Sequence, residues 1–187
     1  MALLISHRGN INGINNALEN TPDYINKALE EGFHVLVDVM LVGTNHLALG
    51  IDVPKFPLRL EFLKNNLLIA RTNNLPTLDY LISNQVHCFL DEGNHPSTLT
   101  SGGLIWTTYS SQISERCIYS MPEWTVDDLS KIRHMPCAGI CSDHIGKFAE
   151  FRKDDHVIIE NINNMAIVIQ KNWRRKLVQL KKIFNSL

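Results

Sequence analysis

Seven short apolar runs, rich in β-branched and aromatic residues, do most to limit the folds open to this chain. Turn residues or helical stretches bound each run, which is the pattern of strands buried on both faces of a parallel sheet. The runs span residues 2–6, 34–40, 67–70, 86–90, 104–107, 117–120 and 138–141. They predict seven parallel strands.

Helical patterns lie between several of the runs. Residues 21–31 carry apolar side chains at helical spacing, with Pro22 in the first turn and Gly32 after the last. Similar patterns predict helices over residues 58–65, 76–83 and 125–133. This alternation of strand and helix predicts an α/β fold whose parallel sheet is either doubly wound or closed into a barrel.

Length and composition restrict the architecture further. With 187 residues, 44% of them hydrophobic, the chain can bury one sizeable core and carry an appendage. A complete (β/α)8 barrel takes about 250 residues. If the sheet closes, some crossover helices must therefore be short or missing, most obviously between Leu90 and Ser120.

Charge, cysteines and hydropathy exclude several classes of protein. The formal net charge of −1 gives no overall basic field for nucleic acid, so we expect no such partner. The four cysteines are scattered through apolar segments, which favours buried thiols over disulfides or a zinc site. No apolar run approaches the roughly 18 to 20 residues of a bilayer span, and the N-terminus lacks a secretory signal. We expect a soluble, cytoplasmic protein without a transmembrane segment.

Residues 160–187 differ in composition from the rest of the chain. They are rich in Lys and Arg, and apolar side chains from Met165 to Leu180 recur at spacings of three and four, which predicts a basic amphipathic helix. Its sequence resembles the front of the IQ motif, which implies a calmodulin-like partner bound by Ile169, Gln170, Trp173 and Arg174. Two alternatives are that the helix packs on the main domain or adsorbs to an anionic membrane surface.

Three motifs near the N-terminus carry the chemistry. His7-Arg8-Gly9 directly follows the first run, Glu19-Asn20-Thr21 opens the first helix, and Asp38 lies in the second run. In this order and at these separations they resemble the opening of the glycerophosphodiester phosphodiesterase family, and the likeness extends over residues 3–145. The segments LTSGGLIWTTYSS and IYSMPEW also resemble members of that superfamily from large DNA viruses and some microbes.

The resemblance implies a compact, partly reduced (β/α) TIM-type barrel over residues 1–158, followed by the C-terminal helix. His7 and Arg8 would be catalytic, and Arg8 would also bind the phosphodiester. Glu19, Asp38 and Asp52 would hold a divalent cation, Ca²⁺ or Mg²⁺, through carboxylate oxygens. Such groups converge at the carboxyl ends of barrel strands.

Two departures from the family pattern weaken the expected activity. Leu36 stands where the family has a metal-binding glutamate, and Ile51 stands where it has a second catalytic histidine. His46, Asp91 and Glu92 are candidate replacements. We expect a degenerate phosphodiesterase-like protein. The alternatives are a scaffold that recruits a calmodulin-like partner, and a plain structural role in which His7 and Arg8 cap a strand and Asp143 caps a turn.

Overall fold

The computed structural model describes residues 2–109, 111–155, 160, 162, 163 and 165. The chain divides into two compact units, Met1–Phe148 and Ala149–Leu187. Ile169, Gln170, Trp173 and Arg174 lie outside the described residues, so the calmodulin-like partner stays a prediction. Among the described helices, none combines the length and the hydropathy that a membrane span requires.

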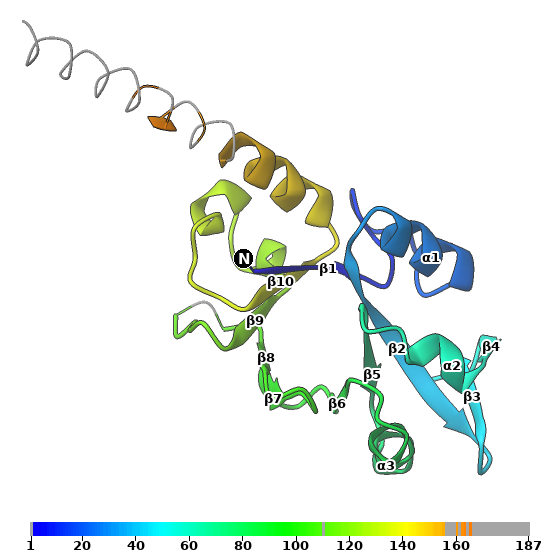
Figure 1. Cartoon of the computed structure of the whole chain (residues 1–187). Helices are drawn as coiled ribbons and strands as arrows, with labels where there is room; N and C mark the ends of the chain where they lie inside the picture. The colour runs from blue at the N-terminus through cyan, green and yellow to red at the C-terminus, as the bar shows by residue number, and fades with distance from the viewer. Residues whose placement is uncertain (1, 110, 156–159, 161, 164, 166–187) are drawn as a thin grey trace, which may run out of the picture. The chain divides into compact units, whose positions relative to one another are not determined.

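The first unit is an α/β structure built on a mixed, mostly parallel ten-stranded sheet (Figure 1). Seven strands run parallel in the order β6-β5-β2-β1-β10-β9-β8. They are β1 Leu3–His7, β2 His34–Val42, β5 Leu68–Thr72, β6 Cys88–Leu90, β8 Ile105–Thr107, β9 Cys117–Ser120 and β10 Gly139–Ser142. Each overlaps one of the seven predicted runs, and the predicted α/β class is confirmed.

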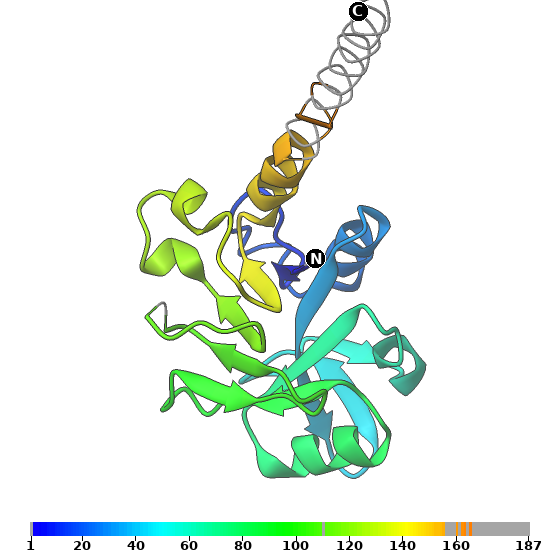
Figure 2. The same cartoon turned by 60° about the vertical axis from the view of Figure 1, so that its left-hand side comes forward.

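Three further strands are antiparallel additions that the hydrophobic pattern did not predict. β3 His46–Leu49 pairs antiparallel with the C-terminal half of β2, and β4 Phe56–Leu58 pairs antiparallel with β3. β7 Ser97–Leu99 forms a hairpin with β8 (Figure 2, green). Between Leu90 and Cys117 the described residues, which omit residue 110, contain no helix. The prediction that a crossover helix is missing from this part of the chain is confirmed.

Two helices pack against the sheet. α1 Pro22–Glu30 packs on β2, and α3 Leu75–Ser83 packs on β2 and β6. The Thr21 hydroxyl caps α1 by accepting a hydrogen bond from the Tyr24 amide, and the side chain of Asn74 caps α3 in the same way. Both helices were predicted. α2 Leu60–Leu63 is shorter than its predicted range.

The helix predicted over residues 125–133 is wrong. The chain there forms only short 3-10 turns, η1 Pro122–Trp124 and η2 Leu129–Ile132. Asp128 is extended, with φ −122° and ψ 103°, and its carboxylate accepts hydrogen bonds from the Ser130 amide and hydroxyl. Short polar side chains bond neighbouring backbone in this manner and so compete with a continuous helix.

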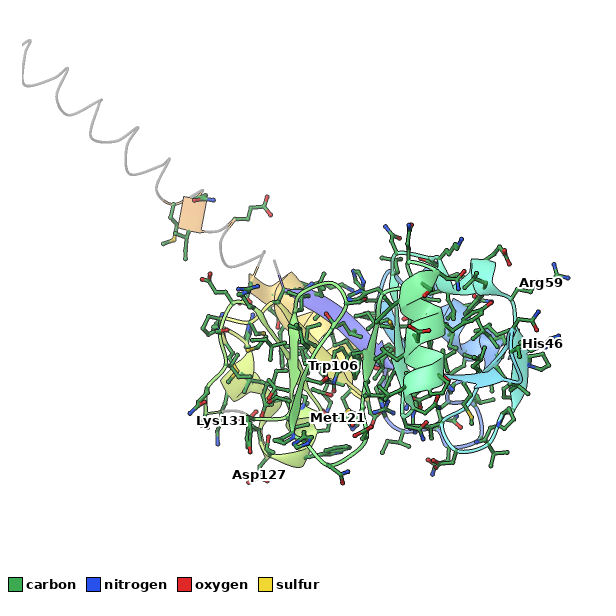
Figure 3. The ribbon with its side chains drawn as sticks, turned by 90° about the horizontal axis from the view of Figure 1, so that it is seen from below. His46, Arg59, Trp106, Met121, Asp127 and Lys131 are labelled. Atoms are coloured by element: carbon green, nitrogen blue, oxygen red, sulfur yellow. The ribbon has the colours of Figure 1, made fainter. Side chains whose placement is uncertain are left out.

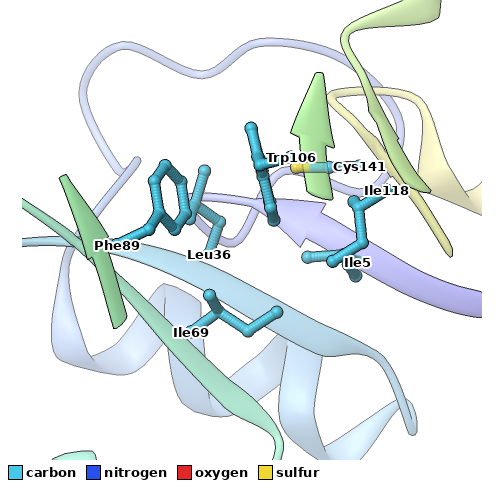
Figure 4. Packing of buried hydrophobic residues seen from close by; sticks show 7 residues of the cluster. All are labelled: Ile5, Leu36, Ile69, Phe89, Trp106, Ile118 and Cys141. Atoms are coloured by element: carbon cyan, nitrogen blue, oxygen red, sulfur yellow. The ribbon is translucent and has the colours of Figure 1, made fainter. Parts of the chain in front are cut away.

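One cluster of the hydrophobic core takes a single side chain from each of the seven parallel strands (Figure 4). The members of this core layer are Ile5, Leu36, Ile69, Phe89, Trp106, Ile118 and Cys141. The rings of Phe89 on β6 and Trp106 on β8 are stacked, with centroids 4.7 Å apart. β6 and β8 are the two ends of the parallel set, so this stack joins them.

Candidate functional site

A polar residue stands two positions after every member of the core layer, in or directly after the same strand. Alternate residues of a strand face the same side of a sheet. A set of polar side chains therefore follows the core layer at the carboxyl ends of the parallel strands. We call this set the polar layer; it comprises His7, Asp38, Arg71, Asp91, Thr108, Ser120 and Asp143.

His7 is held by an acidic partner at the end of β10. Its Nδ1 lies 2.8 Å from Oδ1 of Asp143, and both side chains are buried. The Nδ2 of Asn10 donates to the same oxygen at 2.8 Å, and Glu123 accepts from the Asp143 amide. When Nδ1 is the donor, Nε2 is left with a lone pair and can accept a proton. This is the arrangement of an oriented general base.

The pKa of Asp143 reflects these contacts. Burial raises it, but the hydrogen bond and charge of His7 and the hydrogen bond from Asn10 outweigh burial, so the pKa lies below its ordinary value. Asp143 therefore stays ionised beside His7. From the sequence, a turn cap was one alternative for Asp143; in the structure its carboxylate contacts His7.

Arg8 directs its side chain into the site from a tight turn after β1. Its backbone is left-handed, with φ 56°, and the following Gly9 has φ 90°. A Cβ at Gly9 would lie 2.7 Å from Cδ1 of Tyr24 and 2.9 Å from its carbonyl oxygen, so only glycine fits there. The Nη1 of Arg8 donates to Glu19 at 2.8 Å.

The residues of the Glu19-Asn20-Thr21 motif have separate tasks. Glu19 binds Arg8, and Thr21 caps α1. The side chain of Asn20 both donates to the carbonyl of Asp38 and accepts from its amide, each at 3.0 Å. The motif thus ties the loop after β1 to β2, and it brings three of the predicted site residues, Arg8, Glu19 and Asp38, into one connected group.

The carboxylate of Asp38 lies between two guanidinium groups. Its Oδ1 accepts from Nε of Arg71 at 2.6 Å, and its Oδ2 lies 2.5 Å from Nε of Arg8 in an ion pair that lacks hydrogen-bond alignment. Burial raises the pKa of Asp38, but the charges and hydrogen bond of Arg71, with the charge of Arg8, lower it below its ordinary value. Asp38 is 2% exposed and ionised.

Arg71 was not anticipated from the sequence. It lies in β5 opposite Asp38 of β2, and its Nη1 reaches Oδ2 of Asp91 at 3.5 Å. The one signal that could have identified it is its position two residues after Ile69, at the end of a buried strand.

Two cavities open beside these residues. The larger, about 220 Å³, is lined by the predicted metal ligands Glu19, Asp38 and Asp52, together with Arg8 and Ile51. The smaller, about 100 Å³, is lined by Arg71, Asp91, Ser120, Trp106 and the exposed Trp124, among others. Leu36 does not line either cavity, because its side chain belongs to the core layer.

The carboxylates of the larger cavity do not form a cation site as they stand. Among the described residues, no group of three or more His, Cys, Asp or Glu side chains has the spacing of a metal site. The oxygens of Asp38 face two arginines, and those of Glu19 face Arg8 and Asn10. Asp52 is exposed, 3.4 Å from Nδ2 of Asn73.

The three residues that could replace the family's glutamate and second histidine lie in different environments. Asp91 is paired with Arg71, and Glu92 is exposed. His46 is exposed at the margin of the molecule, whereas Trp106 lies in the interior (Figure 3). None of the three lines the larger cavity.

Comparison of the chain with models of protein families, with curated proteins and with solved structures finds no match in any of the three. The function of the chain must therefore be inferred from the polar layer and its two cavities.

Proposed function

We propose that the chain is a phosphodiesterase-like protein, related to the metal-dependent glycerophosphodiester hydrolases, that binds a phosphate-bearing ligand and has lost efficient catalysis. The observation that carries the proposal is the joining of three separate sequence motifs in one site: Arg8 contacts Glu19 and Asp38, and Asn20 clamps the backbone of Asp38. A cavity of about 220 Å³ opens directly on this group.

We further propose that the parallel sheet closes into a reduced barrel of the TIM type. Three facts support closure. The parallel strands pair in chain order on both sides of β1. The core layer receives one side chain from each strand, as the interior of a barrel does. The stack of Phe89 on Trp106 joins the two ends of the parallel set, and Ser101, between β7 and β8, donates its amide to Cys88 of β6 at 2.8 Å.

The site has one of the two proton-transfer groups that acid and base catalysis of hydrolysis would use. Arg8, which lines the larger cavity, would give a phosphodiester oxygen charge-assisted hydrogen bonds. His7 is oriented by Asp143 and is not itself part of the cavity lining; it would accept or return one proton at the margin of the site. Ile51 lines the cavity where a second proton-transfer group would be needed. General acid and base catalysis contributes roughly 10²- to 10⁴-fold to rate, so we expect binding with little turnover.

The test is hydrolysis and binding of a glycerophosphodiester by the purified full chain, with and without divalent cation. We expect saturable binding that His7→Ala preserves and Arg8→Ala abolishes, and a turnover that is weak and lost in His7→Ala. His46→Ala is the matched control, because His46 is exposed, whereas His7 is buried and held by Asp143. Absence of both binding and turnover in the native chain would reject the proposal.

A further inference from the structure

We propose that Arg71 is the built-in cation of this site, and that its guanidinium takes the place of a divalent metal between Asp38 and Asp91. A phosphate-bearing ligand would then bind without Ca²⁺ or Mg²⁺. The nature of the ligand rests on the proposed function above, whereas the exclusion of the metal depends only on the described contacts.

The strand register fixes where Arg71 stands. In the parallel pairing of β2 with β5, Arg71 is opposite Asp38, and in the pairing of β5 with β6 it is opposite Phe89, two residues before Asp91. The side chain of Arg71 consequently lies between carboxylates from the two neighbouring strands. Its Nε and Nη1 contact Asp38 and Asp91 at 2.6 and 3.5 Å, respectively.

The charge of Arg71 is needed there. An ionised carboxylate as buried as Asp38 is unfavourable unless positive charge and hydrogen bonds compensate it. Arg71 is itself largely buried, with its side chain 15% exposed, so the pair is shielded from water and from salt. A divalent cation could lie between Asp38 and Asp91 only by displacing this guanidinium.

While Arg71 occupies the oxygens of Asp38 and Asp91, the ligands left for a metal are too few. Ca²⁺ takes six to eight oxygen ligands and Mg²⁺ demands an octahedron of them. Leu36, one side chain deeper than Asp38 on the same strand, belongs to the core layer and offers no oxygen. Leu36 and Arg71 therefore act in the same direction. Leu36 provides no oxygen ligand for a metal, and the guanidinium of Arg71 supplies the positive charge that a metal would have brought.

Arg8 remains available to the ligand while Arg71 neutralises Asp38 from the opposite side. Arg8 lines the larger cavity, and its Nη2 makes no hydrogen bond or ion pair with the other described residues. Arg71 lines the smaller cavity instead. Arg71 is therefore a positioning residue, which holds Asp38 and, through it, Arg8.

The first experiment measures cation binding by terbium luminescence in the full chain. Trp106 and Trp124 line the cavity of Arg71, so Tb³⁺ bound between Asp38 and Asp91 would be sensitised by excitation of tryptophan. We expect no saturable signal from the native chain or from Arg71→Lys, which keeps the charge. Arg71→Met should gain a signal that Ca²⁺ competes away and that Asp38→Asn abolishes in the same background.

Saturable Tb³⁺ binding by the native chain, unchanged in Arg71→Met, would overturn the inference. The second experiment needs no variant, and so it decides the matter even if Arg71→Met does not fold. Binding of glycerophosphoglycerol to the native chain is measured in EDTA and in Ca²⁺, and equal affinity is expected. Affinity tighter by about tenfold or more in Ca²⁺ would overturn the role of Arg71 but leave the proposed function standing. No binding in either buffer would reject the proposed function, and the terbium result would still decide what Arg71 does.

Discussion

At the scale of single residues, the site is organised around one buried carboxylate. Asp38 contacts two arginines through its side chain and Asn20 through its backbone, so the loop after β1 and the strands β2 and β5 all meet at this residue. Breaking a buried ion pair by removing one partner leaves the other charge uncompensated, which is far more costly than losing an exposed pair. Substitution of Asp38 should thus affect stability as well as binding.

We expect Asp38→Asn to lower the free energy of unfolding by about 3 kcal/mol, measured by urea denaturation near pH 7. The exposed Asp52 provides the control, and Asp52→Asn should change stability by no more than about 0.5 kcal/mol. Similar losses in the two variants would contradict the central role of Asp38.

The same carboxylate predicts how stability depends on pH. The pKa of Asp38 in the folded chain lies below the ordinary value of 3.8, as does that of Asp143. Their contribution to stability is complete above that ordinary value and is lost as the pH falls through the lower, folded pKa. Acid titration followed by circular dichroism should show native stability falling below about pH 4, and the fall should be shallower in Asp38→Asn. Equal slopes would show that the pKa of Asp38 is not lowered by folding.

The turn that carries Arg8 makes a separate prediction at Gly9. Gly9→Ala combines a left-handed backbone with a clash against Tyr24, whereas Gly43→Ala has the left-handed backbone alone, since nothing lies within 4 Å of a Cβ at Gly43. We expect a loss of about 1 kcal/mol for Gly43→Ala and a clearly larger loss for Gly9→Ala, measured by thermal unfolding. Equal losses would mean that Tyr24 moves aside easily.

At the scale of elements, hydrophobic runs and helix-capping residues predict those strands and helices whose formation depends on local sequence. The seven buried strands and helix α1 were predicted because their apolar residues form uninterrupted or helical patterns. β3, β4 and β7 were missed because they are short, partly exposed strands whose pairing depends on the neighbouring hairpin. Arg71 was missed because no local pattern shows which residue of another strand will stand opposite Asp38.

The C-terminal segment leads to a prediction that depends on its sequence alone. If residues 160–187 recruit a calmodulin-like protein, a chain ending at residue 159 should fold normally and no longer bind calmodulin in the presence of Ca²⁺. Trp173→Ala in the full chain should weaken binding as well, since aromatic anchors dominate such interfaces. Unfolding of the shortened chain would instead assign the segment to the core, and undiminished binding would place the partner site elsewhere.

At the scale of the whole molecule, the proposed closure of the sheet can be tested at one aromatic contact. Phe89 and Trp106 belong to strands that are far apart in the pairing order, yet their rings stack at 4.7 Å with planes 27° apart. Stacked aromatic pairs have coupling energies of about 0.5 to 1.5 kcal/mol beyond the area that they bury. A double-mutant cycle between the two positions consequently measures whether β6 and β8 meet in solution.

We expect Phe89→Leu and Trp106→Leu to be individually destabilising and their coupling energy to fall in that range. Phe89→Leu paired with Ile25→Val is the control, because Ile25 is buried in α1 and outside the core layer. That control pair should be additive within about 0.5 kcal/mol. An additive Phe89 and Trp106 pair would mean that the ends of the parallel set are separate.

The placement of Leu36 one layer below Asp38 also restricts the order in which substitutions can accumulate. A glutamate at position 36 would put a second carboxylate among apolar side chains while Arg71 and Arg8 are already committed to Asp38. Loss of Arg71 before that change would leave Asp38 and Asp91 short of positive charge. Each single step toward a metal site therefore passes through a less stable protein, so positions 36 and 71 would have to change together.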